Sequence, residues 1–379
     1  MGINLTLTTK PGKEENALTF DTSLVHRFTI LAINTGSTST KIAVYHDDTP
    51  AMEISLSHST EELAQFESIP AQAEWRKEVI LKALEENNIA IDTLSAVIGR
   101  GGLLRPIESG VYIVTDAMVE ELRTTSQQHA SNLSAPIAAQ IAAMGGVMAY
   151  IADPVVVDEL MDVARLSGIK QIPRCSIFHA LNQKATARLY AEQIGTPYEE
   201  LNLVVAHLGG GISVAAHRKG LVIDCNNALD GEGPIAPERA GTIPAGALID
   251  LCYSGQYSKK EARALLVGKG GLVALTGSNS VKDIMQRAEA GDAEAKSAID
   301  AMIYTVAKQI GQMAVSLHGE VDAILLTGGI AHSKVITEAI SDYCRFLAPI
   351  EVYPGENELQ ALAMNALRVL RGEMTAKNY

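Results

Sequence analysis

Three glycine-centred loops are the segments of this chain best suited to binding phosphate. They run from Asn34 to Lys41, from His207 to Gly211 and from Thr327 to Gly329, and each follows an apolar run. Glycine has no Cβ, so backbone N–H groups can turn inward and approach an anion closely, and hydroxyl side chains add further donors. Together the three loops indicate a cradle for the phosphates of a nucleotide.

The first loop offers Asn34, Ser37, Ser39 and Lys41 to phosphate oxygens. Four residues separate Gly36 from Lys41, as in a Walker phosphate loop, but the second glycine of that motif is absent. A strand pattern follows instead of a helix, so the helix start that aids anion binding in the Walker motif is missing as well. We therefore interpret the segment as a hairpin turn, with a plain polar hairpin as the alternative.

The second loop gives the strongest of the three signals. Gly209, Gly210 and Gly211 lie between two apolar runs, where three glycines weaken local structure and allow close backbone approach. The third loop, with Gly328 and Gly329, follows another apolar run and alone would predict no more than a turn. It gains meaning from the other two loops.

Several polar residues near these loops are not explained by apolar packing. Each one taken singly predicts a surface or satisfied polar group, whereas the set indicates chemistry. The set comprises Arg100, His129, Asp153, His179, Arg239 and Glu358.

Composition limits the class of protein. The chain has 379 residues and 47% hydrophobic residues, which predicts two globular domains. No apolar run reaches the ~18–20 residues of a membrane span, and no export signal is recognisable, so we expect a cytoplasmic protein with no membrane partner. The net charge of −13 argues against a nucleic-acid partner. The four cysteines are scattered, as expected for reduced thiols without a metal or disulfide framework.

The apolar pattern predicts a strand, turn, strand unit in each half of the chain. The first is expected over residues 28–33 and 41–45, and the second over 203–206 and 212–216. Helices are expected over 61–88, 134–148, 299–317 and 359–370, and further strands over 95–98, 147–151 and 323–326. Residues 1–26 are polar and lack periodicity, which predicts an extension outside the fold. The last helix is expected to pack back on the first half.

From about residue 27 onward, the chain resembles the acetate kinase family, and within it the kinases that act on butyrate. These enzymes transfer phosphate between ATP and a short-chain carboxylate. The resemblance runs through residues 33–41, 99–103, 153–159, 176–184, 206–211, 226–234 and 237–242.

The resemblance implies a role for each candidate residue. Arg100 would clamp the carboxylate, and His179 and Arg239 would stabilise the transferring phosphoryl group. Substrate contact would fall to His129, Phe178 and Leu103. Asp153 and Glu358 would orient Mg²⁺ through water. The residues that would bind the phosphates or the rest of the nucleotide are Asn34, Ser37, Ser39, Lys41, His207, Gly209, Gly210, Gly211, Gly328 and Gly329. Glu356 lies two residues from Glu358 and is an alternative to it.

The resemblance also implies an α/β fold of two similar actin-like, ribonuclease H-like lobes with a nucleotide cleft between them. We expect residues 27–155 plus 358–379 in the first lobe and 156–357 in the second. ATP or ADP and Mg²⁺ would be the cofactors, a carboxylate or acyl phosphate the small-molecule partner, and a homodimer or larger homo-oligomer the assembly.

Two alternatives keep the lobes but change the function. A kinase acting on a sugar hydroxyl would require a carboxylate base beside the acceptor and would leave Arg100 without a role. An assembly or chaperone ATPase would hydrolyse ATP slowly and would not respond to short acids.

Overall fold

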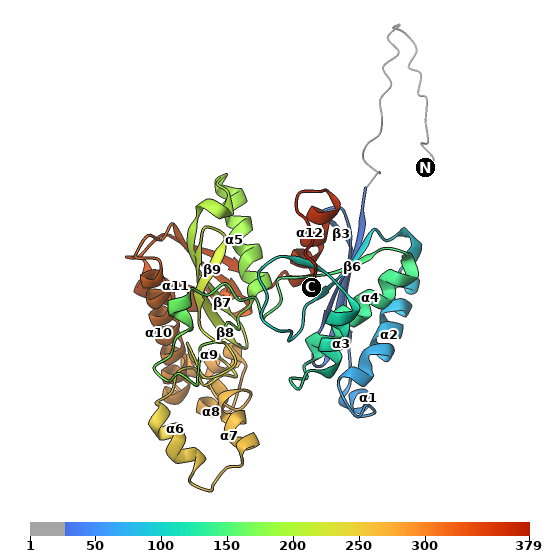
Figure 1. The fold of residues 1–379 in the computed structure, drawn as a ribbon. Helices are drawn as coiled ribbons and strands as arrows, with labels where there is room; N and C mark the ends of the chain where they lie inside the picture. Colours follow the sequence, from blue (N-terminus) through green and yellow to red (C-terminus); the bar gives the residue numbers. More distant parts are fainter. Residues whose placement is uncertain (1–26) are drawn as a thin grey trace.

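The computed structural model describes residues 27–379, so the extension expected over residues 1–26 lies outside the described residues. Two β-sheets form the framework, each at the centre of one of the two bodies in Figure 1. Among residues 27–379, no helix combines the length and the apolar character needed to cross a bilayer.

The first sheet has six strands in the order β3-β2-β1-β4-β6-β5. β1 pairs antiparallel with β2 and parallel with β4, and β4 pairs parallel with β6. The strands are β1 (Thr29–Thr35), β2 (Ser39–His46), β3 (Thr49–Ser57), β4 (Ala96–Arg100), β5 (Val111–Ile113) and β6 (Met148–Ala152).

The second sheet has five strands in the order β11-β10-β7-β8-β9. β7 pairs antiparallel with β8 and parallel with β10, and β10 pairs parallel with β11. The strands are β7 (Asn202–Leu208), β8 (Ile212–Arg218), β9 (Leu221–Cys225), β10 (Ala323–Gly328) and β11 (Ile350–Pro354). The order β9-β8-β7-β10-β11 therefore repeats β3-β2-β1-β4-β6, with the same parallel and antiparallel neighbours.

Helices cover both faces of each sheet. Those before the second sheet are α1 (Thr60–Leu63), α2 (Ala73–Glu86), α3 (Asp116–Thr124), α4 (Ser134–Gly145) and α5 (Ala180–Ile194). The later helices are α6 (Ala245–Cys252), α7 (Lys259–Leu266), α8 (Leu272–Thr276), α9 (Val281–Glu289), α10 (Ala293–Ser316), α11 (Lys334–Cys344) and α12 (Glu358–Leu370). Short 3₁₀ turns are η1 (Pro70–Gln72), η2 (Ile91–Thr93), η3 (Ala130–Leu133), η4 (Asp162–Arg165), η5 (Tyr198–Glu200) and η6 (Gly329–His332).

The C-terminal helix α12 belongs to the core of the first sheet. Leu359, Leu362 and Leu367 pack with Ile30 and Ile98 on one face of that sheet. α2 and α4 cover its other face. This return of the chain brings Glu358, the first residue of α12, back to β1 and β4.

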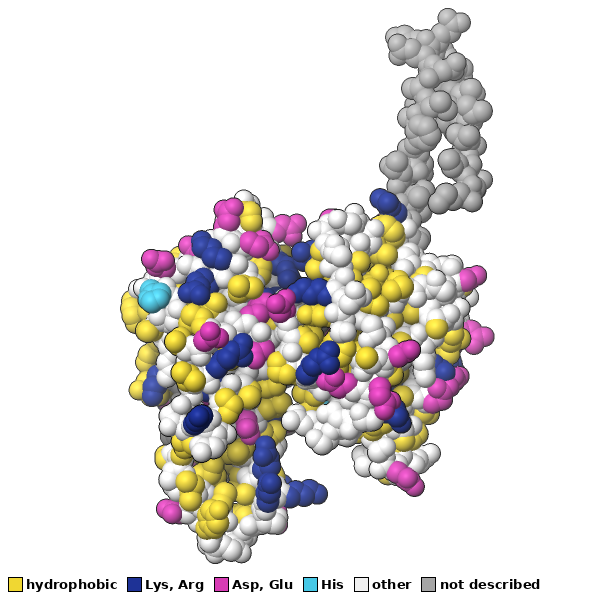
Figure 2. Space-filling model, in the orientation of Figure 1, with side chains coloured by type: hydrophobic (Ala, Val, Ile, Leu, Met, Phe, Trp, Pro, Cys, Tyr) yellow, Lys and Arg dark blue, Asp and Glu magenta, His cyan; other side chains and the backbone are white. Residues whose placement is uncertain are grey.

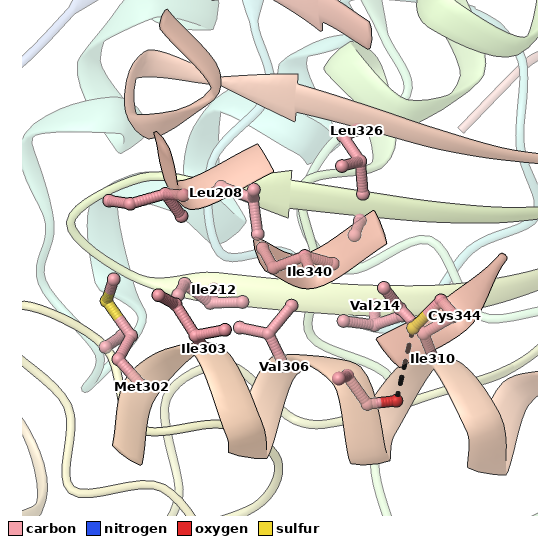
Figure 3. Close-up of a cluster of buried hydrophobic side chains, with 14 of the residues drawn as sticks. Leu208, Ile212, Val214, Met302, Ile303, Val306, Ile310, Leu326, Ile340 and Cys344 are labelled. Atoms are coloured by element: carbon pink, nitrogen blue, oxygen red, sulfur yellow. Dashed lines mark hydrogen bonds between the residues drawn. The ribbon is translucent and has the colours of Figure 1, made fainter. Parts of the chain in front are cut away.

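The core of the second body lies between its sheet and α10. Met302, Ile303, Val306 and Ile310 project from α10 toward Ile212, and Figure 3 also shows α11 contributing side chains to this cluster. The apolar stripe expected over residues 299–317 is thus a core stripe. Cys344 of α11 closes the cluster with a weak bond from its Sγ to the backbone oxygen of Ala307, at 3.8 Å.

The helical region expected over residues 61–88 is present, and the structure divides it into α1, η1 and α2. Ser59 caps α1 with a reciprocal bond to Glu62, and the helix ends after one turn. Pro70 then begins η1, and α2 follows directly. Proline has no N–H to donate to the preceding turn, so a continuous helix through it is disfavoured.

Candidate active site

The first glycine loop is a tight hairpin between β1 and β2. Asn34 and Lys41 face each other in register, and the backbone N–H of Gly36 donates to the oxygen of Ser39 at 2.8 Å. Ser37 is exposed at the tip, as is Lys41 at the start of the return strand. The hairpin therefore leaves hydroxyl and ammonium groups available to a ligand.

The second and third loops are held against each other by a close backbone contact. The Gly209 N–H donates to the oxygen of Gly211 at 3.2 Å, which closes the turn between β7 and β8. Gly328 has φ of 92°, and a Cβ there would lie 2.4 Å from the oxygen of Leu208. Only glycine fits this position, because a side chain would be both strained and in collision.

These two loops line a cavity of about 700 Å³ on the second body. Gly209, Gly210 and Gly329 form part of its wall, with His332 and Glu356 beside them. The volume lies within the range of small-molecule sites, ~300–1,000 Å³. Figure 2 shows Lys, Arg, Asp and Glu side chains along the junction of the two bodies.

Residues from three distant segments meet where α12 approaches the first sheet. Glu358 is buried and accepts from Asn34 Nδ2 at 2.5 Å and from Arg100 Nη1 at 3.3 Å. The other amide atom, Asn34 Oδ1, is buried and has no protein partner among residues 27–379. A buried acceptor without a donor is costly, so this atom is suited to a ligand or its water.

Two histidines are stacked at the edge of the second sheet. His179 directly precedes α5 and His207 lies in β7, with ring centroids 3.7 Å apart and planes inclined by 9°. His207 Nε2 lies 3.1 Å from Glu356 Oε1, and this bond holds the pKa of Glu356 below its ordinary value. Burial, followed by the charges of His207, Arg100 and Arg239, holds the pKa of His179 well below its ordinary value.

Arg239 approaches the same region from the loop after β9. Its Nε is buried without a partner in the described chain, while its Nη1 donates to the backbone oxygen of Glu238 at 3.0 Å. Burial lowers the pKa of Arg239. Desolvation, then Arg100 and Arg239, lowers the pKa of His129. Arg100 of the first body and Arg239 of the second therefore both lower the pKa values of His129 and His179.

Asp153 is placed apart from this cluster. It is buried at φ of 39°, and its carboxylate accepts from Ser109 Oγ at 2.6 Å and from the Gly110 N–H at 2.8 Å. Its second oxygen lies 3.4 Å from Arg188. Because protein donors occupy both oxygens, the surroundings of Asp153 favour a structural role over the expected metal role.

The two residues expected to form the acid-binding wall differ in position. Phe178 is 2% exposed and packs in a core cluster with Val157, Leu160 and Val222, so its ring does not line an open wall. Leu103 is half-buried and follows Arg100 closely in the chain. Leu103 is the better candidate for contact with an apolar substrate tail.

The side chains suit Mg²⁺ better than a tightly ligated metal. Among residues 27–379, no three His, Cys, Asp or Glu side chains form a metal-binding group. Mg²⁺ prefers oxygen ligands and keeps several waters, so it requires few protein atoms. The orphaned Asn34 Oδ1 beside the carboxylate of Glu358 fits such an ion or its hydration shell.

Sequence reasoning missed three residues that support the site. Arg76 of α2 is 1% exposed and donates to the backbone of the first hairpin. Gln183 and Ser213 are buried beside His179. The spacing from His179 to Gln183 was the only available signal, because residues four apart share one face of a helix.

Two sheets of one topology, each with a glycine hairpin at the site, define an α/β protein with the actin-like fold. Comparison with solved structures agrees. The acetate kinase of Porphyromonas gingivalis superposes with a TM-score of 0.73 at 18% identity, covering 90% of this chain and 100% of that one. A propionate kinase of Francisella tularensis gives 0.72 at 19% identity, covering 89% and 98%.

The sequence comparisons define the family. The acetokinase family model matches residues 168–361. A "Probable butyrate kinase" of Clostridium botulinum is 52% identical over 353 residues, which is 93% of this chain and 99% of the relative. "Butyrate kinase 2" of Clostridium acetobutylicum is 51% identical over 354 residues, with the same coverage. The chain belongs to the acetokinase family, and the resemblance and the fold class predicted from the sequence are confirmed.

Proposed function

We propose that this protein transfers the terminal phosphoryl group of ATP to a short-chain carboxylate, and that acids of about butyrate size are its acceptors. The observation that carries the proposal is that charged and imidazole side chains stand beside the glycine loops: Arg100 shares Glu358 with Asn34 of the first loop, and His179 stacks on His207 at the start of the second. Membership of the acetokinase family and the identity to relatives named butyrate kinase support the same reaction.

The reaction is an in-line displacement. A carboxylate oxygen attacks the terminal phosphorus of ATP and forms a new O–P bond. The bond from that phosphorus to the bridging oxygen breaks, its electron pair leaves with ADP, and the reverse reaction makes ATP from acyl phosphate. Carboxyl groups with reference pKa values near ~4 are ionised at neutral pH, so no general base is needed. Positioning and charge neutralisation supply the catalysis.

The site residues divide between the two substrates. Arg100 would hold the carboxylate through paired N–H bonds, exchanging its contact with Glu358 for the substrate. The unpartnered Nε of Arg239 and the ring of His179 would donate to the equatorial phosphoryl oxygens. His129 and His207 would contact neighbouring phosphate or substrate oxygens.

The glycine loops would hold the nucleotide. The first hairpin offers Asn34, Ser37, Ser39 and Lys41 to the phosphates. The second and third loops line the cavity of about 700 Å³, which would receive the rest of ATP or ADP. Closure of the lobes formed by residues 27–155 with 358–379 and by residues 156–357 would exclude water from the transfer.

Mg²⁺ would neutralise charge on the phosphate chain when bound. Glu358 and Asn34 would hold the hydrated ion, with Glu356 as the alternative carboxylate.

Acid length would be selected by contact with apolar residues such as Leu103. Each buried CH₂ contributes ~0.8 kcal/mol, so two extra methylenes change the preference by only about tenfold to twentyfold. We therefore propose a graded preference across butyrate, isobutyrate and longer branched acids. We also propose, from the family alone, a cytoplasmic homodimer or larger homo-oligomer.

Trapping the product tests the proposed function. The full chain is incubated with Mg-ATP, hydroxylamine and a series of unbranched and branched acids of about two to six carbons, because hydroxylamine converts acyl phosphate to a coloured hydroxamate. Acid-dependent hydroxamate with a maximum near four carbons is expected. ATP hydrolysis without hydroxamate for any acid would overturn the proposal and favour an assembly ATPase. Phosphorylation of a sugar in its place would favour a sugar kinase.

A further inference from the structure

We propose that a buried chain of hydrogen bonds, beginning at Tyr198 and ending at His179, fixes the tautomer of His179. The chain runs through His217, Gln183 and Ser213. It keeps the proton of neutral His179 on Nε2, as a donor for the transferring phosphoryl group. Only this last use rests on the proposed function, since the tautomer is a property of the protein without ligands.

The elements bring these residues together by their spacing. Ser213 and His217 are four apart in β8, so both side chains project from the same face of that strand. Gln183 is one helical turn beyond His179, on the face of α5 that packs against the strand. Ser213, His217 and Gln183 are all 0% exposed, so the hydrogen bonds among these three residues are shielded from solvent.

A backbone carbonyl determines which atoms donate and which accept in this series of hydrogen bonds. Gln183 Nε2 lies 3.0 Å from the backbone oxygen of Ser213. A carbonyl oxygen only accepts, so the side-chain atom facing it must be the NH₂ group. The amide orientation of Gln183 is thereby fixed, and its Oε1 is the atom that faces His217 Nε2 at 3.0 Å.

Between Gln183 and Tyr198, the fixed amide of Gln183 determines which atom carries each proton. Gln183 Oε1 accepts from His217 Nε2, which must carry the hydrogen. Burial, then Lys184 and Arg188, holds the pKa of His217 well below its ordinary value, so the ring is neutral and its Nδ1 is an acceptor. The hydroxyl of Tyr198 donates to this Nδ1 at 2.8 Å, and burial raises the pKa of Tyr198, which keeps the hydroxyl protonated.

Between Gln183 and His179, the hydroxyl of Ser213 connects the hydrogen-bonded residues to the candidate active site. Its Oγ accepts from Gln183 Nε2 at 2.9 Å and from the backbone N–H of His179 at 3.3 Å. A hydroxyl oxygen has two lone pairs and one proton, so the proton remains to be donated. His179 Nδ1, at 2.8 Å, is its acceptor. The reverse direction would place three donors on one oxygen and leave the hydroxyl proton without an acceptor in the described chain.

The consequence is an imidazole that donates and does not act as a base. With Nδ1 occupied as an acceptor, neutral His179 carries its hydrogen on Nε2, for which residues 27–379 provide no acceptor. Donors held in place before charge develops stabilise a transition state without reorganisation. Ser213, Gln183 and His217 are therefore positioning residues that act through His179.

Nitrogen NMR of the full chain with ¹⁵N-labelled histidine tests the tautomer directly. In the ligand-free protein at neutral pH, the resonances lost in His179→Asn identify this ring. We expect a protonated Nε2 and a pyridine-like Nδ1. A protonated Nδ1, or protons on both nitrogens, would overturn the inference, and this measurement does not depend on enzyme activity.

Variants of Ser213 test the link to turnover. Ser213→Ala should give a mixture of tautomers and lower kcat by about tenfold or more, with KM for ATP and acid changed by less than about twofold. Ser213→Thr keeps a hydroxyl and should restore both the NMR pattern and most of kcat. Ser341→Ala, which removes a hydroxyl bonded within α11, is the matched control. An unchanged tautomer or an unchanged kcat in Ser213→Ala would overturn the positioning role. Failure of the hydroxamate assay with the expected tautomer would reject the proposed function alone.

Discussion

The imidazole of His179 lies parallel to that of His207, with their centroids 3.7 Å apart. Two charged rings at this distance would repel each other. Burial is the main reason why the pKa of His179 is held well below its ordinary value, and the contact with His207 adds to it together with Arg100 and Arg239.

We predict that acid destabilises the fold through its buried histidines. His179 and His217 both have pKa values held well below the ordinary value. The unfolded chain protonates these rings below about pH 6.5, whereas the folded protein does not, so the unfolded state binds more protons. The free energy of unfolding should therefore fall as pH falls below about 6.5, by up to ~1.4 kcal/mol per pH unit for each ring.

Urea unfolding between about pH 5.5 and 7.5 measures this dependence. His217→Gln should flatten the loss on the acid side. Exposed His318→Asn is the matched control and should follow the parent protein. A parent protein that is equally stable at both ends of the range would contradict the prediction.

The two arginines should affect different kinetic constants. Arg100→Ala should raise KM for the carboxylate by about tenfold to a hundredfold and change KM for ATP much less, because it removes a charged bond to the acid. Arg239→Ala should mainly lower kcat, because its unpaired Nε is placed for charge that develops during transfer. Steady-state kinetics with each substrate varied separates the two. Arg123→Ala, an exposed ion-pair partner on α3, is the control. Equal, mild effects of both site variants would reject these roles.

The two C-terminal carboxylates should differ in their effect on magnesium. Glu358→Gln should weaken the apparent Mg²⁺ affinity by about tenfold to a hundredfold, because the carboxylate beside Asn34 would hold the hydrated ion. Glu356→Gln removes the partner of His207 Nε2 and should change the Mg²⁺ requirement less. Activity titrated with Mg²⁺ at fixed ATP measures both variants. A larger shift in Glu356→Gln would move the metal role to Glu356.

The sequence predicted the glycine hairpins because strand pattern and turn chemistry are local properties. Strands were expected over residues 28–33 and 41–45; β1 begins at Thr29 and runs on to Thr35, β2 runs from Ser39 to His46, and the turn between them is the one expected. The helical region over residues 61–88 was likewise predicted from a local pattern, and Pro70 begins η1 where the structure divides that region.

What the sequence could not predict depends on contacts between distant segments. Phe178 and His179 are neighbours in the chain, yet one ring enters a core and the other faces the site, because adjacent side chains leave the backbone in different directions. Ser213 lies 34 residues from His179 and meets it only because β8 packs against α5. No local pattern records such a pairing.

Arg76 is a further residue that only the fold shows, and its loss should destabilise both the protein and its first phosphate loop. The guanidinium is 1% exposed and donates to the backbone oxygens of Gly36 at 2.9 Å, Ser39 at 3.1 Å and Ser37 at 3.3 Å. It bonds to Gln72 as well, and no carboxylate pairs with it in the described chain.

Arg76→Ala removes the guanidinium donor from the partly buried oxygens of Gly36 and Ser37 and leaves Ser39 with only the Gly36 N–H, so we expect a loss of about 2–4 kcal/mol in the free energy of unfolding and a higher KM for ATP. Arg76→Lys should recover only part of both, because one ammonium cannot reach every oxygen that the planar guanidinium reaches. Urea unfolding and ATP kinetics are measured on the same preparations. Lys82→Ala, at an exposed position of the same helix α2, is the matched control and should change neither. If Arg76→Ala unfolded at the urea concentration of the parent protein, the guanidinium would not be what holds the hairpin.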